Sequence, residues 1–192
     1  MARVTTQVAR KEYKCGKCGE TIHKGEKYKK AKLRYSPTMF RCMKFECRFR
    51  QSDLKSSDKL SRAYAVVEMF EDSAFDDEKP IESLQDLSSL LDDACSQIQE
   101  ISDEYNESAD NIEEHFSETD QSSECREKAE NLDSWRDDLE THQSEIDSTI
   151  SDLEDYIDKD FSEEEKSEYE DAIEEARSKF EDAVNCSGEC PV

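Results

Sequence analysis

The chain has no long apolar stretch and few of the residues that fill a hydrophobic core. Of its 192 residues, 34% are hydrophobic and 40% are charged, and the formal net charge is −24. Leu, Ile, Val and Phe together number 33, a share that favours disorder when the net charge is high. A fold is therefore predicted only if those few apolar residues follow a regular pattern.

Two further absences bear on where the protein works. No run approaches the roughly 20 apolar residues that cross a bilayer, and residues 1–14 lack the apolar core of a signal peptide. We therefore expect a protein of the cytoplasm with no membrane association. Thiols stay reduced in that compartment.

An enzyme is not predicted. The glycine patterns of P-loops and dinucleotide sites are missing, and the many carboxylates show no spacing that singles out an acid–base pair. His23, His115 and His142 lie far apart and have no nucleophile partner. His142 also falls on an apolar helical stripe, where packing explains it.

The charges that are present divide the chain in two. Residues 1–50 hold 15 Lys/Arg and 4 Asp/Glu, a net charge of +11, whereas residues 51–192 hold 11 and 46, a net charge of −35. Such asymmetry indicates two parts with different partners. The acidic part is interpreted either as solvated helix faces or as a surface that mimics nucleic acid or binds a basic protein.

Eight cysteines in a reducing compartment indicate a metal site before disulfides. Cys15 and Cys18 form a CxxC pair with a glycine after each cysteine, and Cys42 and Cys47 form a second pair. Zinc takes four such ligands in a tetrahedron, so we predict one structural Zn²⁺ ion on these cysteines, with no open position for catalysis. Unliganded thiols, or His23 in place of one cysteine, are the alternatives.

The region around the cysteines is predicted to be a small α+β finger. Residues 1–14 are expected to form a basic arm, and strands at Lys27–Tyr35 and Met39–Arg41 to form a hairpin across a Ser-Pro-Thr turn. Helix is expected from about residue 45 or 53. The order of knuckle, hairpin and second ligand pair at a helix start resembles a treble-clef finger.

From Pro80 onward the apolar residues recur at spacings of three and four, as in a coiled-coil seam. The first stripe is Leu84, Leu87, Leu91, Ala94, Ile98, Ile101, Tyr105 and Ile112, interrupted at Ser108. The second is Cys125, Leu132, Trp135, Leu139, His142, Ile146, Ile150, Leu153 and Ile157. The third is Tyr169, Ile173, Ala176, Phe180, Ala183 and Val184. Three amphipathic helices in an antiparallel coiled coil or three-helix bundle follow from this pattern.

The same pattern gives the boundaries. In chain order we predict a helix from Pro80 to His115 or Phe116, a turn at 117–123, a break at Asp158–Phe161, a capping box at Ser162–Glu165 and a helix end near Asn185. Gly188 is expected to take a left-handed conformation there. Because like charges repel along these helices, we also expect their stability to depend on salt.

Four regions are therefore predicted, and the helices could also join copies of the chain into oligomers. They are a basic four-cysteine zinc finger at 1–55, a helical linker at 56–79, an acidic antiparallel helical bundle at 80–185 and a cysteine-containing tail at 186–192. Cys95 should lie level with about residue 141, so a disulfide to Cys125 is not expected. Cys186 and Cys190 are either half a metal site, a redox pair or free thiols.

Several motifs resemble small zinc-finger proteins encoded by bacteriophages and prophages. They are Cys15-Gly-Lys-Cys-Gly19, Gly25-Glu-Lys-Tyr28, Cys42, Gln51-Ser-Asp-Leu54, Ile98–Ile112 and Glu124–Leu139. The resemblance implies a four-cysteine finger followed by a coiled-coil hairpin, and a location in the cytoplasm of a host cell. The chain departs from that family at Gln51, where proline is expected, and in its C-terminal cysteine pair.

Two kinds of partner are predicted. Basic residues line the hairpin and could neutralise phosphates of nucleic acid, with Tyr28 and Tyr35 stacking on unpaired bases. The basic set is Lys24, Lys27, Lys29, Lys30, Lys32 and Arg34. The alternatives are that this surface docks on the chain's own acidic helices, that the helices bind a host or viral protein as a scaffold, or that they mimic DNA and inhibit a host protein.

Overall fold

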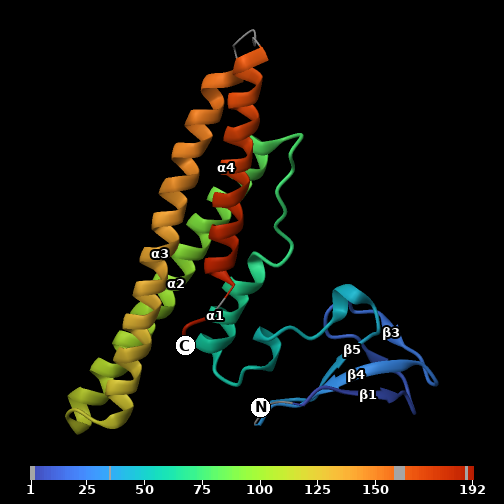
Figure 1. Cartoon of the computed structure of the whole chain (residues 1–192). Coiled ribbons are helices and arrows are strands. Elements are labelled where there is room, and N and C mark those ends of the chain that lie inside the picture. Colours follow the sequence, from blue (N-terminus) through green and yellow to red (C-terminus); the bar gives the residue numbers. More distant parts are fainter. Residues whose placement is uncertain (1–2, 35, 158–162, 189) are drawn as a thin grey trace. The chain divides into compact units, whose positions relative to one another are not determined.

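The computed structural model describes residues 3–34, 36–157, 163–188 and 190–192 (Figure 1). The chain divides into two compact units, Met1–Ala65 and Val66–Val192. The strands and the first four cysteines of the chain belong to the first unit, and three long helices make up most of the second. The predicted combination of a small α+β unit with a larger helical one is therefore confirmed. Each unit is described by itself.

A three-stranded antiparallel sheet forms the base of the first unit, in the order β1 (Thr5–Val8), β4 (Lys27–Ala31), β5 (Met39–Arg41). A separate two-stranded sheet pairs β2 (Tyr13–Lys14) with β3 (Thr21–Ile22). The hairpin of β4 and β5 confirms the two predicted strands, although β4 ends at Ala31. The prediction of an arm at residues 1–14 is wrong, because β1 pairs with β4.

Aromatic side chains fill the core of the first unit. The rings of Tyr13 and Phe40 stack with centroids 4.5 Å apart, and that of Tyr28 lies 5.1 Å from Tyr13. Ala9 and Ile22 are buried in the same cluster, which also includes two of the cysteines. This core is small, as expected for a domain of this length that relies on further cross-links.

The chain after the second cysteine pair is not α-helical at first. Short 3₁₀ turns occupy Phe45–Cys47 and Ser52–Leu54, and α1 begins only at Asp58 and ends at Met69. The predicted onset of helix at about residue 45 or 53 is thus met only by these short 3₁₀ turns, and the first α-helix begins later. Asp53 explains the second turn, because its carboxylate accepts hydrogen bonds from the Arg50 N–H (3.1 Å) and from the Arg41 guanidinium (3.0 Å).

Three long helices pack side by side in the second unit (Figure 1). They are α2 (Pro80–Phe116), α3 (Asp120–Ile157) and α4 (Glu163–Ser187). Ser88 donates to Asp147 (2.7 Å) and Ser102 to the carbonyl of Ala129 (3.4 Å), so residue numbers fall along α3 as they rise along α2. The two helices are therefore antiparallel, as predicted.

Helix α4 returns antiparallel to α3. Lys179 Nζ contacts Thr149 Oγ1 (3.1 Å), and the Trp135 indole N–H donates to the carbonyl of Cys186 (3.3 Å). Trp135 therefore lies level with the C-terminal end of α4. The end of the α2–α3 pair at which these two helices are joined extends beyond α4 (Figure 1).

The apolar stripes form the core of the second unit. Of the predicted seam, the buried members are Leu84, Leu87, Leu91, Ala94, Ile98, Ile101, Tyr105, Leu132, Trp135, Leu139, Ile146, Leu153, Ala176, Phe180 and Ala183. Ala109 is buried where Ser108 interrupts the stripe, and Thr149 is buried beside a half-buried Ile150. Each fully buried Leu or Ile contributes about 1.5–3 kcal/mol, which opposes the repulsion among the acidic faces.

The helix ends differ in part from the predictions. Helix α2 spans the predicted range, but α3 begins at Asp120, inside the predicted turn. Thr119 explains that start, because its Oγ1 accepts from the backbone N–H of Ser122 (3.1 Å) as an N-cap does. Helix α4 ends at Ser187, and Gly188 does not have a positive φ, so its predicted left-handed conformation is wrong.

The break at Asp158–Phe161 and Ser162 of the capping box lie outside the described residues. The segment before α2 packs on the bundle. The ring of Phe75 meets that of Phe180 edge to face, with centroids 5.5 Å apart, and Asp77 forms an ion pair with Arg177. Within the described parts of the chain, no helix has the length and hydrophobicity that a membrane crossing requires.

Candidate metal centre

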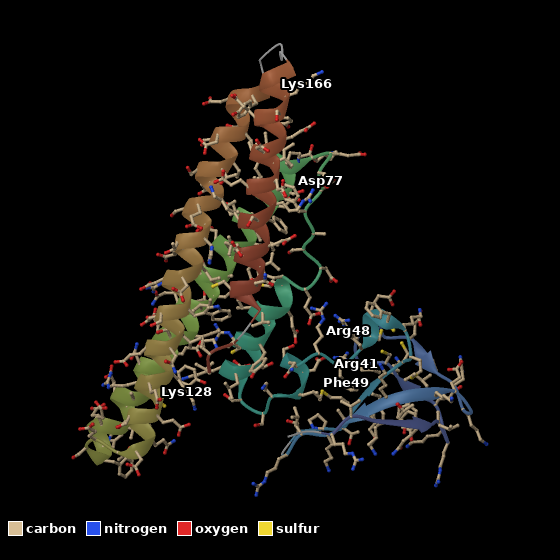
Figure 2. All side chains as sticks on the ribbon, viewed as in Figure 1. Arg41, Arg48, Phe49, Asp77, Lys128 and Lys166 are labelled. Carbon is tan, nitrogen blue, oxygen red and sulfur yellow. The ribbon has the colours of Figure 1, made fainter. Side chains whose placement is uncertain are left out.

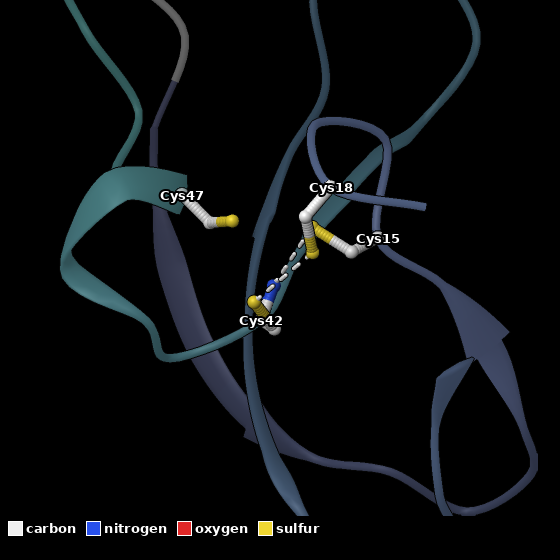
Figure 3. Close-up of side chains that lie close together, drawn as sticks. All are labelled: Cys15, Cys18, Cys42 and Cys47. Carbon is white, nitrogen blue, oxygen red and sulfur yellow. Dashed lines mark hydrogen bonds between the residues drawn. The ribbon is translucent and has the colours of Figure 1, made fainter. Parts of the chain in front are cut away.

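Four cysteines meet at one point of the first unit (Figure 3). Cys15 and Cys18 lie in the loop after β2, Cys42 follows β5, and Cys47 ends the first 3₁₀ turn. Their sulfur atoms all lie within 4.8 Å of one another. All four predicted ligands are therefore brought together, and none forms a disulfide.

The first pair is held by a tight turn of backbone. The Cys15 N–H donates to the carbonyl of Glu20 (2.8 Å), and the Gly19 N–H donates to the carbonyl of Cys15 (3.0 Å). Gly19 has φ +74°, in the left-handed region that side chains disfavour. The Gly16 N–H donates to the carbonyl of Phe40 (2.8 Å), which ties this turn to β5 and so to Cys42.

The sulfur spacing fits a tetrahedral ion. Cys18 Sγ and Cys42 Sγ are 3.8 Å apart. Two thiolates bound to zinc at about 2.3 Å with tetrahedral angles lie about 3.8 Å apart. The four side chains thus have both the chemistry and the spacing of a site that could hold a metal ion.

The pKa values of Cys15, Cys42 and Cys47 are shifted in different directions. Burial raises the pKa of Cys15, but backbone N–H groups of Cys18, Cys42 and Lys17 outweigh it and lower that pKa to about 6. Burial, together with the neighbouring sulfurs, raises the pKa of Cys47 to about 12, and burial also raises that of Cys42. A cation is needed before all four thiols can lose their protons together.

Two basic side chains, Lys44 and Arg41, lie near the cysteines in the chain. Lys44 bonds the carboxylate of Glu20 at 2.5 Å, which raises the lysine pKa, and the charges of Cys18 and Cys42 raise it further. Arg41 is buried, and its guanidinium pairs with the carboxylate of Asp53 in the second 3₁₀ turn. Its Nη1 would lie 3.6 Å from a Cβ atom placed on Gly16. Each of these cations is already paired with a carboxylate, so the two pairs add little net positive charge beside the sulfurs.

Other candidate ligands lie elsewhere. His23 is exposed and its Nδ1 lies 3.1 Å from Glu12 Oε1, so it is not part of the cluster. In the described residues, Cys95, Cys125, Cys186 and Cys190 form no disulfide, and none belongs to a metal-type cluster. Cys95 donates to the carbonyl of Arg136 (3.9 Å), near the level expected for it on α3.

The predicted nucleic-acid residues follow β4 and its flanking loops. Lys27, Lys29 and Lys30 lie in the strand, Lys24 in the turn before it, and Lys32 and Arg34 after it. Because successive side chains of a strand point to opposite faces, Lys29 and Lys30 do not share one face. The structure therefore distributes these cations around the central strand.

One expected contact is wrong. Tyr28 is 3% exposed, packs among the core aromatics and donates its hydroxyl to Gln7 Oε1 (3.1 Å), so its ring cannot stack on a base. Tyr35 lies outside the described residues.

Sequence reasoning missed residues that support or adjoin the cluster. Arg41 and Asp53 clamp the segment that follows the cysteines, and a buried ion pair is hard to recognise from sequence. Met43 and Phe45, between the second pair of ligands, are 48% and 73% exposed. The sequence feature that could have identified these two residues is the pattern Cys-Met-Lys-Phe-Glu-Cys, in which large apolar residues lie between predicted metal ligands.

Comparison with known proteins gives no match to a protein-family model, to a curated protein or to a solved structure.

Proposed function

We propose that this chain is a zinc-binding, non-enzymatic protein whose basic finger contacts nucleic acid. The observation that carries the zinc assignment is the cluster of four cysteine sulfurs within 4.8 Å, with the 3.8 Å spacing of a tetrahedral thiolate pair. Zinc favours thiolates in such a site, and a site closed by four protein ligands stabilises structure and leaves no position for a reacting water.

The zinc assignment is tested by metal analysis of the full chain. We expect one zinc ion per chain, and no bound zinc in a Cys42→Ser, Cys47→Ser double variant. A Cys95→Ser, Cys125→Ser double variant is the matched control, because it removes two thiols outside the cluster and should keep the ion. A wild-type chain that binds iron, or no metal, contradicts the assignment.

The charge of the finger supports nucleic acid as its partner. Residues 1–50 carry a net charge of +11, and four of the proposed contacts, Lys24, Lys27, Lys32 and Arg34, are exposed. Lysines neutralise phosphates and release counterions, so binding of this kind weakens steeply with salt. Residues 3–34 and 36–55 of the finger contain no α-helix that could read bases in a groove, because α1 begins only at Asp58. Contact would therefore be through the backbone of the nucleic acid.

The nucleic-acid assignment is tested by salt-dependent binding of the full chain to a labelled oligonucleotide. Replacing Lys24, Lys27 and Lys32 by Ala should weaken binding and reduce the slope of log K against log salt by about 0.7 for each lost contact to a single strand. Wild-type affinity in this variant would reject the site.

A matched control for net charge removes three lysines of the helical unit. Lys128, Lys166 and Lys179 should be replaceable by Ala without loss of binding, because they lie outside the finger.

A second candidate function rests on α2. This helix contains 11 carboxylates and no Lys or Arg, and carboxylate oxygens line the outer faces of the bundle (Figure 2). We propose that this surface binds a basic host or viral protein, as a scaffold or as a mimic of nucleic acid. Affinity capture with the chain as bait, followed by light scattering of the chain alone and with any captured protein, tests the proposal. A chain that is monomeric and captures no basic protein contradicts it.

We further propose a phage or prophage origin, a treble-clef-like finger, a coiled-coil seam and action in the host cytoplasm. The motifs around Cys15, Gln51–Leu54 and Glu124–Leu139 support the origin. The hairpin between the two cysteine pairs supports the finger type, and the spacing of three and four along the buried stripes supports the seam.

A further inference from the structure

The loop between the second pair of cysteines presents an exposed aromatic ring. Phe45 is 73% exposed and Met43 is 48% exposed, although both are flanked by the cluster residues Cys42 and Cys47. Two backbone hydrogen bonds fix the 3₁₀ turn of this loop, from the Cys47 N–H to the carbonyl of Lys44 (3.1 Å) and from the Arg48 N–H to that of Phe45 (3.0 Å). The two ends of the loop, Cys42 and Cys47, both belong to the cysteine cluster. The ring is therefore held on a rigid support and covered by little of the protein.

Phe45 differs from Tyr13, Tyr28, Phe40 and Phe49, the other aromatic residues of the finger that the structure describes. Tyr13, Tyr28 and Phe40 pack against one another in the core, and Phe49 lies under the guanidinium of Arg41 at 5.6 Å (Figure 2). Scattered exposed apolar residues are common on proteins. The ring of Phe45 adds nothing to the core and lies in the same short loop as a second exposed apolar side chain. A role in folding therefore explains this ring less well than a single scattered apolar residue.

A cation lies on the ring. The guanidinium of Arg48 is 4.7 Å from the centroid of Phe45. This pairing of a guanidinium with an aromatic face is the combination that single-strand-binding proteins use, since the ring stacks on a base and the cation attracts phosphate.

We propose that Phe45 is a stacking platform for an unpaired base of single-stranded nucleic acid. The proposal rests on the proposed function and names its substrate class. Charge complementarity favours this occupant, because residues 1–50 have a net charge of +11 and a polyanion is attracted to them. Bases of an intact duplex are stacked on one another, so Phe45 distinguishes single strands from duplexes.

Direct binding measurements with the zinc-loaded full chain test this proposal. The probes are a labelled oligothymidylate of about 12 nucleotides, within the usual site size, and a duplex of equal length. We expect tighter binding of the single strand. Phe45→Ala should weaken single-strand binding by about 5- to 150-fold, the range of one stacked base, and change duplex binding little.

Two variants separate stacking from structure. Phe45→Trp keeps a large ring and should keep single-strand affinity. Val8→Ala removes an apolar side chain that is 56% exposed on β1, away from the cysteine loop, and should leave both affinities unchanged. Zinc content and the slope of affinity against salt should be the same in all variants, because the phosphate contacts are retained.

The outcomes are separable. If wild type binds neither probe, the proposed nucleic-acid function fails. If wild type binds and Phe45→Ala binds the single strand equally well, only the stacking platform is overturned. Equal losses on single strand and duplex, or failure of Phe45→Trp to retain affinity, also overturn it.

Discussion

The acidic face of α2 allows a quantitative prediction about stability. Its 11 carboxylates include eight pairs spaced three or four residues apart, with no Lys or Arg on the helix to separate them. Like charges at these spacings destabilise a helix by about 0.2–0.5 kcal/mol per pair. Arg126 of α3 offsets part of this repulsion by forming ion pairs with Asp110 and Glu113. We therefore expect the remaining repulsion, which salt can screen, to destabilise the helical unit by about 1–3 kcal/mol.

Glu107 is the best single position at which to test this. Asp103, Glu104 and Asp110 lie three or four residues from it, and Glu107 is exposed. Glu107→Gln should stabilise the helical unit by about 0.5–1 kcal/mol at low salt, which raises the melting temperature by about 1–4 °C for a unit of this size. The gain should vanish near 1 M salt, where screening acts over about 3 Å.

Thermal melting of the full chain, followed by far-ultraviolet circular dichroism, measures both effects. The control is Glu124→Gln, because that carboxylate bonds Lys128 at 2.6 Å and its loss should give no stabilisation. The reasoning is refuted if wild-type melting temperature does not rise from about 0.01 M to about 1 M salt, or if Glu107→Gln and the control behave alike.

Other predictions follow from individual contacts. The hydrogen bond from Arg126 lowers the pKa of Glu113, so its stabilising effect is present at neutral pH and lost as pH falls through that lowered pKa; the difference in melting temperature between wild type and Arg126→Met should therefore shrink in acid. Trp135, the only tryptophan, is 5% exposed and bonds the carbonyl of Cys186, so Trp135→Ala should destabilise the helical unit by about 3–5 kcal/mol in denaturant unfolding; a loss under 1 kcal/mol would contradict this packing. Gly19→Ala should destabilise the zinc-loaded finger by about 1–2 kcal/mol, because φ is positive there, and equal resistance to chelator in both proteins would oppose it. Removing the metal with a chelator should collapse the dispersed NMR signals of the finger while leaving most helical dichroism, since the helical core contains no cysteine of the cluster.

Several features could be predicted from local spacing. The CxxC turn and the second cysteine pair identified all four members of the cluster, because thiol chemistry and short-range chain geometry restrict what such residues do. The apolar stripe of α2 was equally informative, since burial on one side of a helix requires apolar residues every three or four positions.

Other features needed long-range contacts. Residues 1–14 have the composition of an arm, and only pairing of β1 with β4 makes part of them a strand. The second cysteine pair was expected at a helix start, but Cys47 lies in a short 3₁₀ turn. A second 3₁₀ turn follows, in which the carboxylate of Asp53 accepts hydrogen bonds from Arg41 and from the Arg50 N–H.

By itself, the sequence determined the cysteine cluster, the separation of basic from acidic parts and the helical stripes, because each depends on residue type and near spacing. Only the tertiary structure decided which aromatic ring faces solvent. Tyr28 and Phe45 both follow a lysine directly in the sequence, yet Tyr28 is 3% exposed and Phe45 73%. Burial depends on what the rest of the chain packs against a side chain: Tyr13 and Phe40 cover Tyr28, whereas the cysteine loop holds Phe45 away from that core.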